Sequence, residues 1–449
     1  MVKKATAAPA ADALFGFDGH EDWRKMLHER IPGGAHTYSK GDDQFPADAP
    51  PALERGEGAW TFAPGGAKYL DMAMGLRSVT LGHCYPAVVE AVAESLKVGN
   101  NFSRPSIYEA KYAENLVRVL RWPDMVKFCK NGSTATSAAV KLARAHTGRA
   151  LVARCRQQPF FSYDDWFIGS TACPRGVPDE VAKLTVQFDY DSLESVDRLL
   201  AEHPGKISCL ILEPATDRPP SRGFLEGLRE RCTKHEVVLI FDEMILGFRL
   251  ALGGGGERYG VEPDLATFGK GMANGFSMAA LVGKRAIMEQ GDITEGRRKV
   301  FLVSTTHGAE ICTIFAAQAA LNVYRRKDVI GALGAFGSRL KTEFNEASRR
   351  LGLLENIRMD GFDVMPSLLL ARGGKPDPEL RTLFMQEMLK GGVLIPYLAP
   401  SLSHGKPELE ALLEAFAKAG RVLARALKEN SLRSLINGPV VKPVFREIN

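Results

Sequence analysis

Two charged side chains each follow a short apolar run in the middle of the chain. Asp242 follows the run from Val237 to Phe241, and Lys270 follows the run from Leu265 to Gly269. Apolar runs of this length, bounded by turn residues, predict buried parallel strands. Ligands of an open α/β sheet bind beyond the carboxyl ends of its strands, so we expect Asp242 and Lys270 to lie at a ligand site.

Such a carboxylate and amine have two interpretations. One is a simple ion pair, and the other is chemistry with pyridoxal phosphate, which requires a lysine for its Schiff base and an acid for its pyridine nitrogen. Desolvation of Lys270 would lower its pKa and make it a better nucleophile. Met244 would point to the same side as Asp242 and could pack on a ring face, although a plain core methionine fits equally well.

The segment from Lys130 to Arg149 could supply a phosphate site. Asn131, Gly132 and Ser133 stand in an expected loop, 131–134, between a strand and a helix. Backbone N–H groups and the positive end of a helix favour an anion there. Simple capping of the helix by the same residues is the alternative.

Two other segments carry candidate ligand-binding side chains. Phe160 and Phe161 form an aromatic pair that could stack on a flat cofactor or pack in the core. Thr305, Thr306 and His307 precede a predicted helix, which suits either an anion or capping. The glycine run 253–256 lacks the spacing of a dinucleotide-binding fingerprint, so we expect a mobile loop there.

Length and composition limit the classes of function. The chain has 449 residues, enough for two domains, and its 45% hydrophobic and 25% charged residues are typical of a globular protein. A net charge of +5, without a run of basic residues, argues against a nucleic-acid partner. No apolar stretch reaches the roughly 18 residues that a membrane span needs.

The cysteines and the N-terminus bear on location. Seven cysteines are scattered without metal-ligand spacing, which indicates reduced thiols, no metal site and a cytoplasmic protein. The first residues resemble a signal peptide only superficially, because Pro9 and Asp12 interrupt the apolar core, so we expect a flexible tail.

Strands and helices alternate through the middle of the chain. Strands are expected at 125–129, 150–155, 206–213, 237–241, 265–269 and 279–283, with helices between them. This pattern predicts an α/β fold with a parallel or mostly parallel sheet covered on both faces. We expect an N-terminal arm with part of the small domain at 1–75, a large domain at 76–325, and a smaller α+β domain at 326–449. Helices at 309–324 and 327–350 lead into the last segment, in which strands are expected at 353–358 and 366–371 and helices at 377–390 and 407–428.

Three motifs carry a family resemblance that covers about residues 30–430. FDEMILGFR (241–249), PDLATFGKGMANGF (263–276) and STTHG (304–308) resemble, in order and spacing, those of the class III aminotransferases, which are fold-type I pyridoxal-phosphate enzymes. The glutamate-1-semialdehyde aminomutases are the broad relatives.

The resemblance implies a role for each candidate. Lys270 would form the Schiff base and move the proton between the substrate carbon and the cofactor. Asp242 would bind the pyridine nitrogen, with Met244 against the ring where the family usually has Val. Asn131, Gly132 and Ser133 would form the phosphate loop, and Phe160 would lie at the cofactor. Thr306 would reach the phosphate of a neighbouring subunit, which implies a homodimer with shared active sites.

Several departures argue against aminomutase activity. Phe160 and Phe161 replace a Tyr-His pair, Thr134 replaces Glu, and 308–311 replaces Gly-Gly-Asn-Pro. The combination of KNGS, PFFSYDDWFIG and GLRSVTLGH looks like a subgroup of sugar aminotransferases.

The expected function is therefore amine transfer from an amino acid donor, glutamate by preference, to the aldehyde or ketone carbon of a small anionic sugar. The favoured acceptor is the C8 aldehyde of a 3-deoxy-octulosonate. Arg77 is a candidate for a substrate carboxylate because a guanidinium binds carboxylates through paired hydrogen bonds, although a structural ion pair is as consistent. Arg249, Phe161 and His307 are further substrate candidates. The alternatives are an intramolecular aminomutase and a non-catalytic protein that binds a sugar or a partner.

Overall fold

The computed structural model describes residues 14–17, 19, 22–296 and 298–448. The predicted N-terminal tail therefore lies mostly outside the described residues. Within them, no helix combines the length and the apolar character that crossing a membrane requires.

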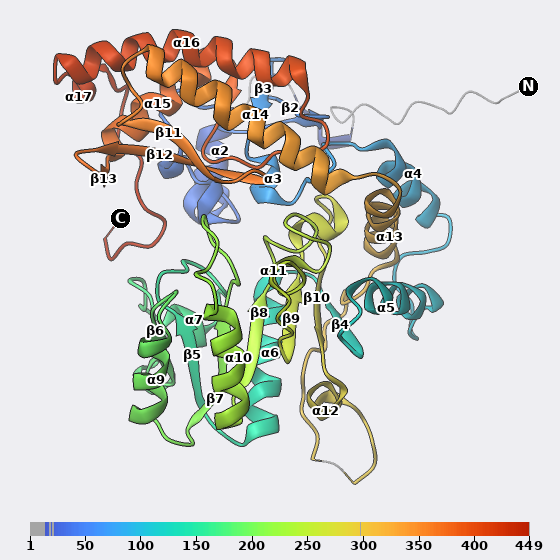
Figure 1. The fold of residues 1–449 in the computed structure, drawn as a ribbon. Coiled ribbons are helices and arrows are strands. Elements are labelled where there is room, and N and C mark those ends of the chain that lie inside the picture. The colour runs from blue at the N-terminus through green and yellow to red at the C-terminus, as the bar shows by residue number, and fades with distance from the viewer. Residues whose placement is uncertain (1–13, 18, 20–21, 297, 449) are drawn as a thin grey trace, which may run out of the picture.

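A seven-stranded sheet forms the centre of the large domain (Figure 1). Its order is β4-β10-β9-β8-β7-β5-β6, and β10 alone runs antiparallel to its neighbours β4 and β9. The α/β fold with a mostly parallel sheet is thus confirmed. The strands are β4 (Met125–Cys129), β5 (Leu151–Cys155), β6 (Thr185–Phe188), β7 (Ile207–Leu212), β8 (Val238–Asp242), β9 (Leu265–Phe268) and β10 (Ala279–Gly283).

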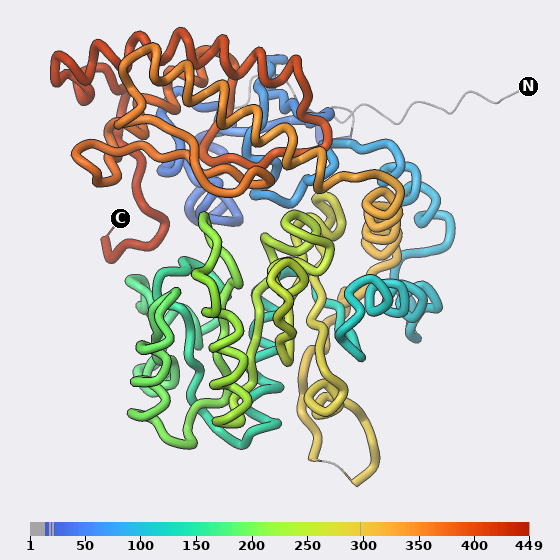
Figure 2. The backbone as a smooth tube through the Cα atoms, in the orientation of Figure 1, coloured from blue at the N-terminus to red at the C-terminus, as the bar shows by residue number. Residues whose placement is uncertain are grey.

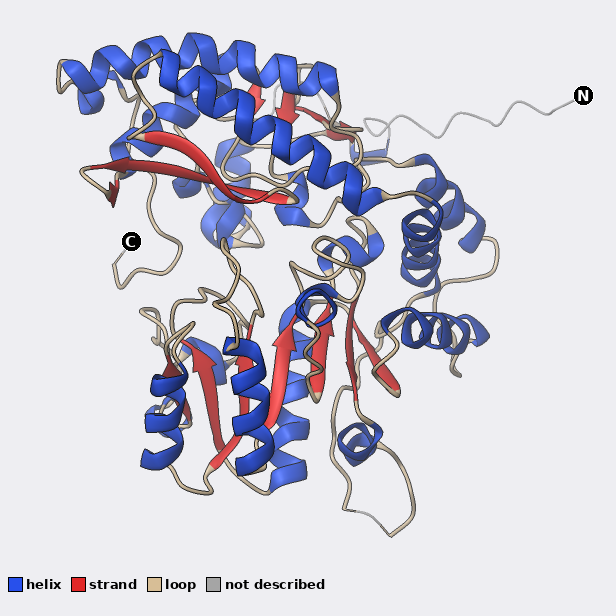
Figure 3. Cartoon of the chain, viewed as in Figure 1, coloured by secondary structure: helices blue, strands red, loops and turns tan. Residues whose placement is uncertain are grey.

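Helices cover both faces of this sheet (Figure 3). On β7, Cys209 and Ile211 share a core with the apolar side chains of α6, whereas Leu210 and Leu212 share one with α10. Because successive strand residues point to opposite faces, two-sided burial requires the continuous apolar runs seen in the sequence. The main helices of the domain are α4 (Pro86–Ser95), α5 (Ile107–Leu120), α6 (Gly132–Thr147), α9 (Leu193–Glu202), α10 (Phe224–His235) and α13 (Ile311–Arg326).

Strand register sets the charged residues side by side. Leu212 pairs with Phe241, and Asp242 pairs with Thr267. Glu213, Asp242 and Lys270 therefore lie at the carboxyl ends of the three adjacent strands β7, β8 and β9.

The small domain combines both ends of the chain. A four-stranded sheet joins β1 (Arg55–Glu57), β2 (Trp60–Phe62) and β3 (Lys68–Asp71) to β14 (Val393–Leu394), which runs parallel to β3. One core holds Leu70 and Met72 together with Phe344, Phe384 and Phe416. The remaining elements are α14 (Val329–Arg350), β11 (Ile357–Phe362), β12 (Met365–Arg372), β13 (Lys375–Pro376), α15 (Pro378–Lys390), α16 (Lys406–Lys428) and α17 (Leu432–Leu435).

Three local expectations differ from the structure. The loop expected at 131–134 is shorter, because Asn131 caps α6 and the helix begins at Gly132. The strand expected at 353–358 begins only at Ile357. Leu353 belongs to the connection that follows α14, and its side chain is buried in the core of the small domain. The helix expected at 309–324 is α13, two residues further along the chain.

The glycine run is the clearest correction. It was expected to be a mobile loop, but residues 253–256 are buried and Gly254 begins the helix α11 (Gly254–Tyr259). The N–H groups of Gly255 and Gly256 each donate to the buried Glu243 carboxylate at 2.8 Å. A Cβ at Gly254 would lie 2.1 Å from Glu243 Oε2, so the run wraps closely around a carboxylate.

Arg249 ties the two domains together. It is 1% exposed, and its guanidinium donates to Val364 O at 3.1 Å, Pro400 O at 2.9 Å and Thr80 Oγ1 at 3.3 Å. We therefore assign Arg249 to the domain junction and not to the substrate, which corrects the expectation from the sequence.

Replacing Arg249 by Leu should lower the free energy of unfolding by about 2–4 kcal/mol, because two buried carbonyl groups lose their donor. Denaturant titration would measure the loss. Arg421→Leu, at an exposed position on α16, is the matched control and should change stability little. Equal losses in the two variants would contradict the assignment.

Candidate active site

Asp242 is the last residue of β8. Hydrogen bonds fix one of its carboxylate oxygens, and the other is available to a ligand. Its Oδ1 accepts from Met244 N at 3.0 Å and from Thr267 Oγ1 at 3.1 Å. Within the part of the chain that the structure describes, Oδ2 makes no hydrogen bond. Burial raises the pKa of Asp242 to about 6, against the opposing effect of Lys270. A protonated ring nitrogen opposite Oδ2 would supply both a hydrogen bond and a positive charge.

Lys270 follows β9 in a left-handed backbone conformation, with φ at 45°. This conformation is uncommon outside glycine and turns the chain sharply. Burial lowers the pKa of the Lys270 amine, while Asp242 and Glu213 act in the opposite direction. The structure thus brings Lys270 and Asp242 together at the carboxyl edge of the sheet.

Glu213 is a third member of this group, to which we gave no role from the sequence. Gln158 holds its backbone at both ends, donating to Glu213 O at 2.7 Å and accepting from Glu213 N at 2.8 Å. Burial and then Asp242 raise the pKa of Glu213 to about 8, and Lys270 and Arg77 oppose this shift. The signal was present, since Glu213 follows a buried apolar run just as Asp242 does.

Met244 packs between two glycines. A Cβ at Gly132 would lie 2.9 Å from Met244 Sδ, and one at Gly269 would lie 2.6 Å from it. A side chain at either position would therefore displace the end of the Met244 side chain. Met244 and the two glycines thus form a flat surface near Asp242, which suits a flat aromatic ring.

The N-terminus of α6 lies beside Met244, because Gly132, the first residue of the helix, packs against that side chain. Asn131 Oδ1 accepts from Thr134 N at 2.9 Å, so the helix is capped by Asn131 and not by the serine or threonine that follows it. The hydroxyl of Ser133 accepts from Tyr163 N at 3.2 Å. The N–H groups of Gly132 and Ser133 have no hydrogen-bond partner among the described residues, so a phosphate fits this helix end as well.

The two phenylalanines have different environments. Phe161 is 2% exposed, lies in the core beside α6, and its carbonyl accepts from Thr136 Oγ1 at 2.8 Å. The structure thus gives Phe161 a packing role, unlike the substrate contact expected from the sequence. Phe160 is 48% exposed and remains the candidate for the cofactor.

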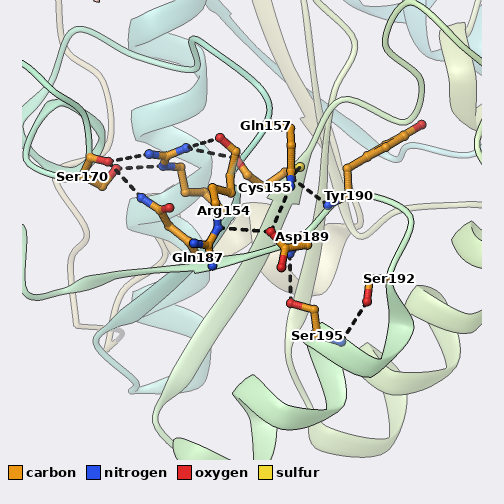
Figure 4. Close-up of polar contacts among 10 residues, drawn as sticks. Arg154, Cys155, Gln157, Ser170, Gln187, Asp189, Tyr190, Ser192 and Ser195 are labelled. Atoms are coloured by element: carbon orange, nitrogen blue, oxygen red, sulfur yellow. Dashed lines mark hydrogen bonds and ion pairs between the residues drawn. The ribbon is translucent and has the colours of Figure 1, made fainter. Parts of the chain in front are cut away.

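A polar network supports the base of the loop that carries Phe160 (Figure 4). Arg154 donates to the hydroxyl and the carbonyl oxygen of Ser170, at 2.8 and 2.5 Å. Gln157 donates to Asp189 at 2.9 Å and accepts from Tyr190 N at 2.9 Å. These contacts fix both ends of the loop 156–170 on β5 and on its neighbour β6, the edge strand of the sheet.

Arg77 lies near Lys270 with no hydrogen-bond partner for its side chain among the described residues. Its Nε is buried and unpaired. Its guanidinium lies over the ring of Tyr397, 4.6 Å from the ring centroid. Burial lowers the pKa of Arg77, and the charges of Tyr397 and Glu213 oppose this shift.

The backbone that carries Arg77 is strained and firmly held. Met74, Gly75, Leu76 and Arg77 all have left-handed φ values, between 44° and 67°. Asp71 Oδ1 accepts from Met74 N at 2.9 Å, and Asp71 Oδ2 lies 3.0 Å from the Nε2 of His83. Strain of this kind persists only where the surroundings impose it, and it is concentrated at functional sites.

Thr306 and His307 lie on the surface of this chain. Thr306 is exposed, and its carbonyl accepts from Asn101 Nδ2 at 3.0 Å. His307 Nδ1 lies 3.4 Å from Glu310, whose other oxygen pairs with Lys130 at 2.5 Å. No recorded contact links Thr306 or His307 with Lys270 or Asp242 in the described chain, so their roles stay predictions.

Comparison with known proteins identifies relatives over nearly the whole chain. The family model for class III aminotransferases matches residues 44–419. A glutamate-1-semialdehyde 2,1-aminomutase of Geotalea daltonii is 31% identical over 432 residues, covering 91% of this chain and all of that protein.

Solved structures show the same similarity. The FumI protein of Sphingopyxis sp. MTA144, in its pyridoxal-phosphate internal aldimine form, has a TM-score of 0.82 and 26% identity, covering 91% of this chain and 97% of that one. An omega-transaminase from Sphaerobacter thermophilus has a TM-score of 0.81 and 25% identity, covering 93% and 100%.

Gly269→Ala should weaken the binding of pyridoxal phosphate, because the new methyl group would push Met244 toward the ring. Overpacking of this kind costs about 1–3 kcal/mol, or roughly 5- to 150-fold in affinity. Titration of the apoprotein with cofactor would measure it. Adding Met244→Ala should restore much of the affinity, and a double variant as weak as Gly269→Ala would contradict the packing argument.

Proposed function

The chain belongs to the class III aminotransferase family, and from this premise we propose that it transfers an amine from an amino acid to an acidic sugar. The family establishes a transaminase with pyridoxal phosphate as cofactor, an amino donor and a carbonyl acceptor. Glutamate is the donor that we favour. The proposed acceptor is the aldehyde or ketone carbon of a small anionic sugar, preferably the C8 aldehyde of a 3-deoxy-octulosonate.

Each residue of the site has a task in this reaction. When bound, pyridoxal phosphate supplies an electron sink for the carbon that carries the amine. Asp242 Oδ2 would hold the proton on the pyridine nitrogen, and Met244 would support the ring. The free N–H groups of Gly132 and Ser133 would bind the phosphate.

Lys270 would hold the cofactor and move the proton. Its Nζ would take the proton from the donor carbon. In the second half of the reaction it would return a proton to the acceptor carbon. Burial favours the neutral amine that this task needs, since it lowers the Lys270 pKa. Glu213, in the field of both Lys270 and Arg77, would balance the charge that appears when the amine is protonated.

Arg77 is the observation that supports an acidic acceptor. A buried N–H group without a hydrogen-bond partner is costly, and Arg77 Nε is such a group in a side chain that is otherwise partly exposed to a ligand. The charge of Arg77 acts on both Lys270 and Glu213, which supports a role for this cation at the reacting end of the site. A carboxylate, as in a keto-acid sugar, is the group that a guanidinium binds best.

The second candidate is an intramolecular aminomutase. The similarity to the Geotalea daltonii protein favours it. Conversion of glutamate semialdehyde without an added amino donor would support this candidate against the transferase. The third alternative, a non-catalytic protein, conflicts with the family membership and the paired Asp242 and Lys270.

A homodimer is part of the proposal. Thr306 is exposed on a turn anchored by Asn101, so its hydroxyl is available to a second subunit. Phe102, Ile107 and Phe301 are large exposed apolar side chains on the adjoining segments. Their burial against a second copy would bring Thr306 to the partner's phosphate. The cytoplasmic location stays a prediction.

Lys270→Ala should abolish turnover and the colour of the bound cofactor, because no other amine replaces its Nζ. Absorbance spectra and borohydride trapping followed by peptide mapping would test this. Lys428→Ala, at an exposed position in the last turn of α16, is the control and should keep wild-type colour and rate. A Lys270→Ala protein with wild-type turnover would overturn the assignment.

Arg77→Met should reduce kcat/KM for an anionic acceptor by about 10- to 100-fold, the size of a lost charge-assisted hydrogen bond. Activity with a neutral aldehyde should change less than about twofold. Arg77→Lys keeps the charge but loses the paired donors, so an intermediate loss is expected. If both acceptors lose activity equally, Arg77 does not bind the acceptor's carboxylate.

A further inference from the structure

The last segment of the chain crosses from the small domain to the large domain. Residues 437–448, here called the C-terminal strap, follow α17 and run toward the loops above β5 and β6 (Figure 2). The match to the family model ends at residue 419. The strap therefore lies outside the residues that the family model matches.

The first half of the strap is tied to the small domain and the N-terminal segment. Asn437 N donates to Gln386 Oε1 at 2.7 Å, and its side chain donates to Asp48 at 2.7 Å. Val441 N donates to Thr382 Oγ1 at 3.0 Å. These contacts fix the position at which the strap leaves the small domain.

The second half contacts the N-terminal segment through Asp43 and the large domain through Cys173. Arg446 forms an ion pair with Asp43 at 2.6 Å, and Lys442 N donates to Asp43 O at 3.0 Å. The thiol of Cys173, which follows the loop 156–170, donates to Arg446 O at 3.1 Å. The strap is thus held on both sides of residue 445.

Phe445 joins an aromatic cluster that includes Phe160, the candidate cofactor contact. Its ring centroid lies 6.5 Å from that of Phe160 and 6.2 Å from that of Phe167. Phe167 is the centre of the cluster, since Phe160 lies 5.8 Å from it and the Arg154 guanidinium packs over its ring at 5.1 Å. The cluster connects the strap with the polar network at the base of the loop.

We propose that Phe445 is a positioning residue that sets the orientation of Phe160, the side chain expected to pack on the cofactor ring. The proposal rests on the proposed function, in which Phe160 contacts pyridoxal phosphate. Phe160 is 48% exposed, and Phe167 and Phe445 are its recorded ring partners. Without Phe445, one ring partner of the two is lost and the Phe160 ring gains freedom to rotate away.

The strap would thereby link the two domains to the cofactor site. A ring held in one orientation loses little entropy when the cofactor packs against it, so binding is tighter. The same contact keeps water from that side of the site. Phe445 has this effect through Phe160, without touching the reacting atoms.

The test compares three variants of the full-length protein. Phe445→Ala should weaken the binding of pyridoxal phosphate about three- to tenfold, the value of one aromatic pair. Phe445→Tyr retains the ring and should restore wild-type affinity. Ile448→Ala, which removes an 83% exposed side chain from the same strap, is the matched control and should leave affinity unchanged.

Amide hydrogen exchange over residues 158–168 gives a second readout, with and without cofactor. Protection should fall in Phe445→Ala alone. Unchanged cofactor affinity in Phe445→Ala, or no recovery in Phe445→Tyr, would overturn the proposal. Wild-type protein that takes up no pyridoxal phosphate would instead overturn the proposed function, while exchange in the apoprotein would still decide whether Phe445 orders the loop.

Discussion

Burial of one amine with two carboxylates at adjacent strand ends is the constraint on which the rest of the site depends. Charged groups removed from water shift their pKa values toward the neutral form, and the shifts of Lys270, Asp242 and Glu213 all have this direction. The group is tolerable because Lys270 opposes the upward pKa shifts of both carboxylates, and they oppose the downward shift of its own pKa. A cationic cofactor ring beside Asp242 would add to this balance, which is one reason why the large domain is built around these strand ends.

The strands and the central pair could be predicted from the sequence for a simple reason. Strands buried on both faces require uninterrupted apolar runs, so a charged residue directly after such a run is conspicuous. Asp242 and Lys270 were found in this way. Glu213 satisfies the same rule, but it lies outside the three motifs that carry the family resemblance, so the resemblance gives it no role.

Other features could not be derived because they depend on segments far apart in the chain. The sequence makes Arg249 a candidate for binding the substrate, but its hydrogen-bond partners Thr80, Val364 and Pro400 come from three distant segments. The glycine run 253–256 looked mobile because Glu243, the carboxylate that it surrounds, lies outside the run. Nothing in the local spacing marked Phe445, whose ring partners are more than 250 residues away in the chain.

The small domain has a consequence for how the protein is made. Its core joins Leu70 and Met72, near the start of the chain, to Phe416 and Leu423 near the end. A ribosome synthesises the first group long before the second, so β3 can pair with β2 early but must wait for β14 while the large sheet acquires its strands. The long connection also makes this association slow, since distant contacts close large loops. The small-domain core is therefore completed only after α16 has been synthesised, and a chain that lacks α16 would leave an exposed half-core for chaperones to recognise.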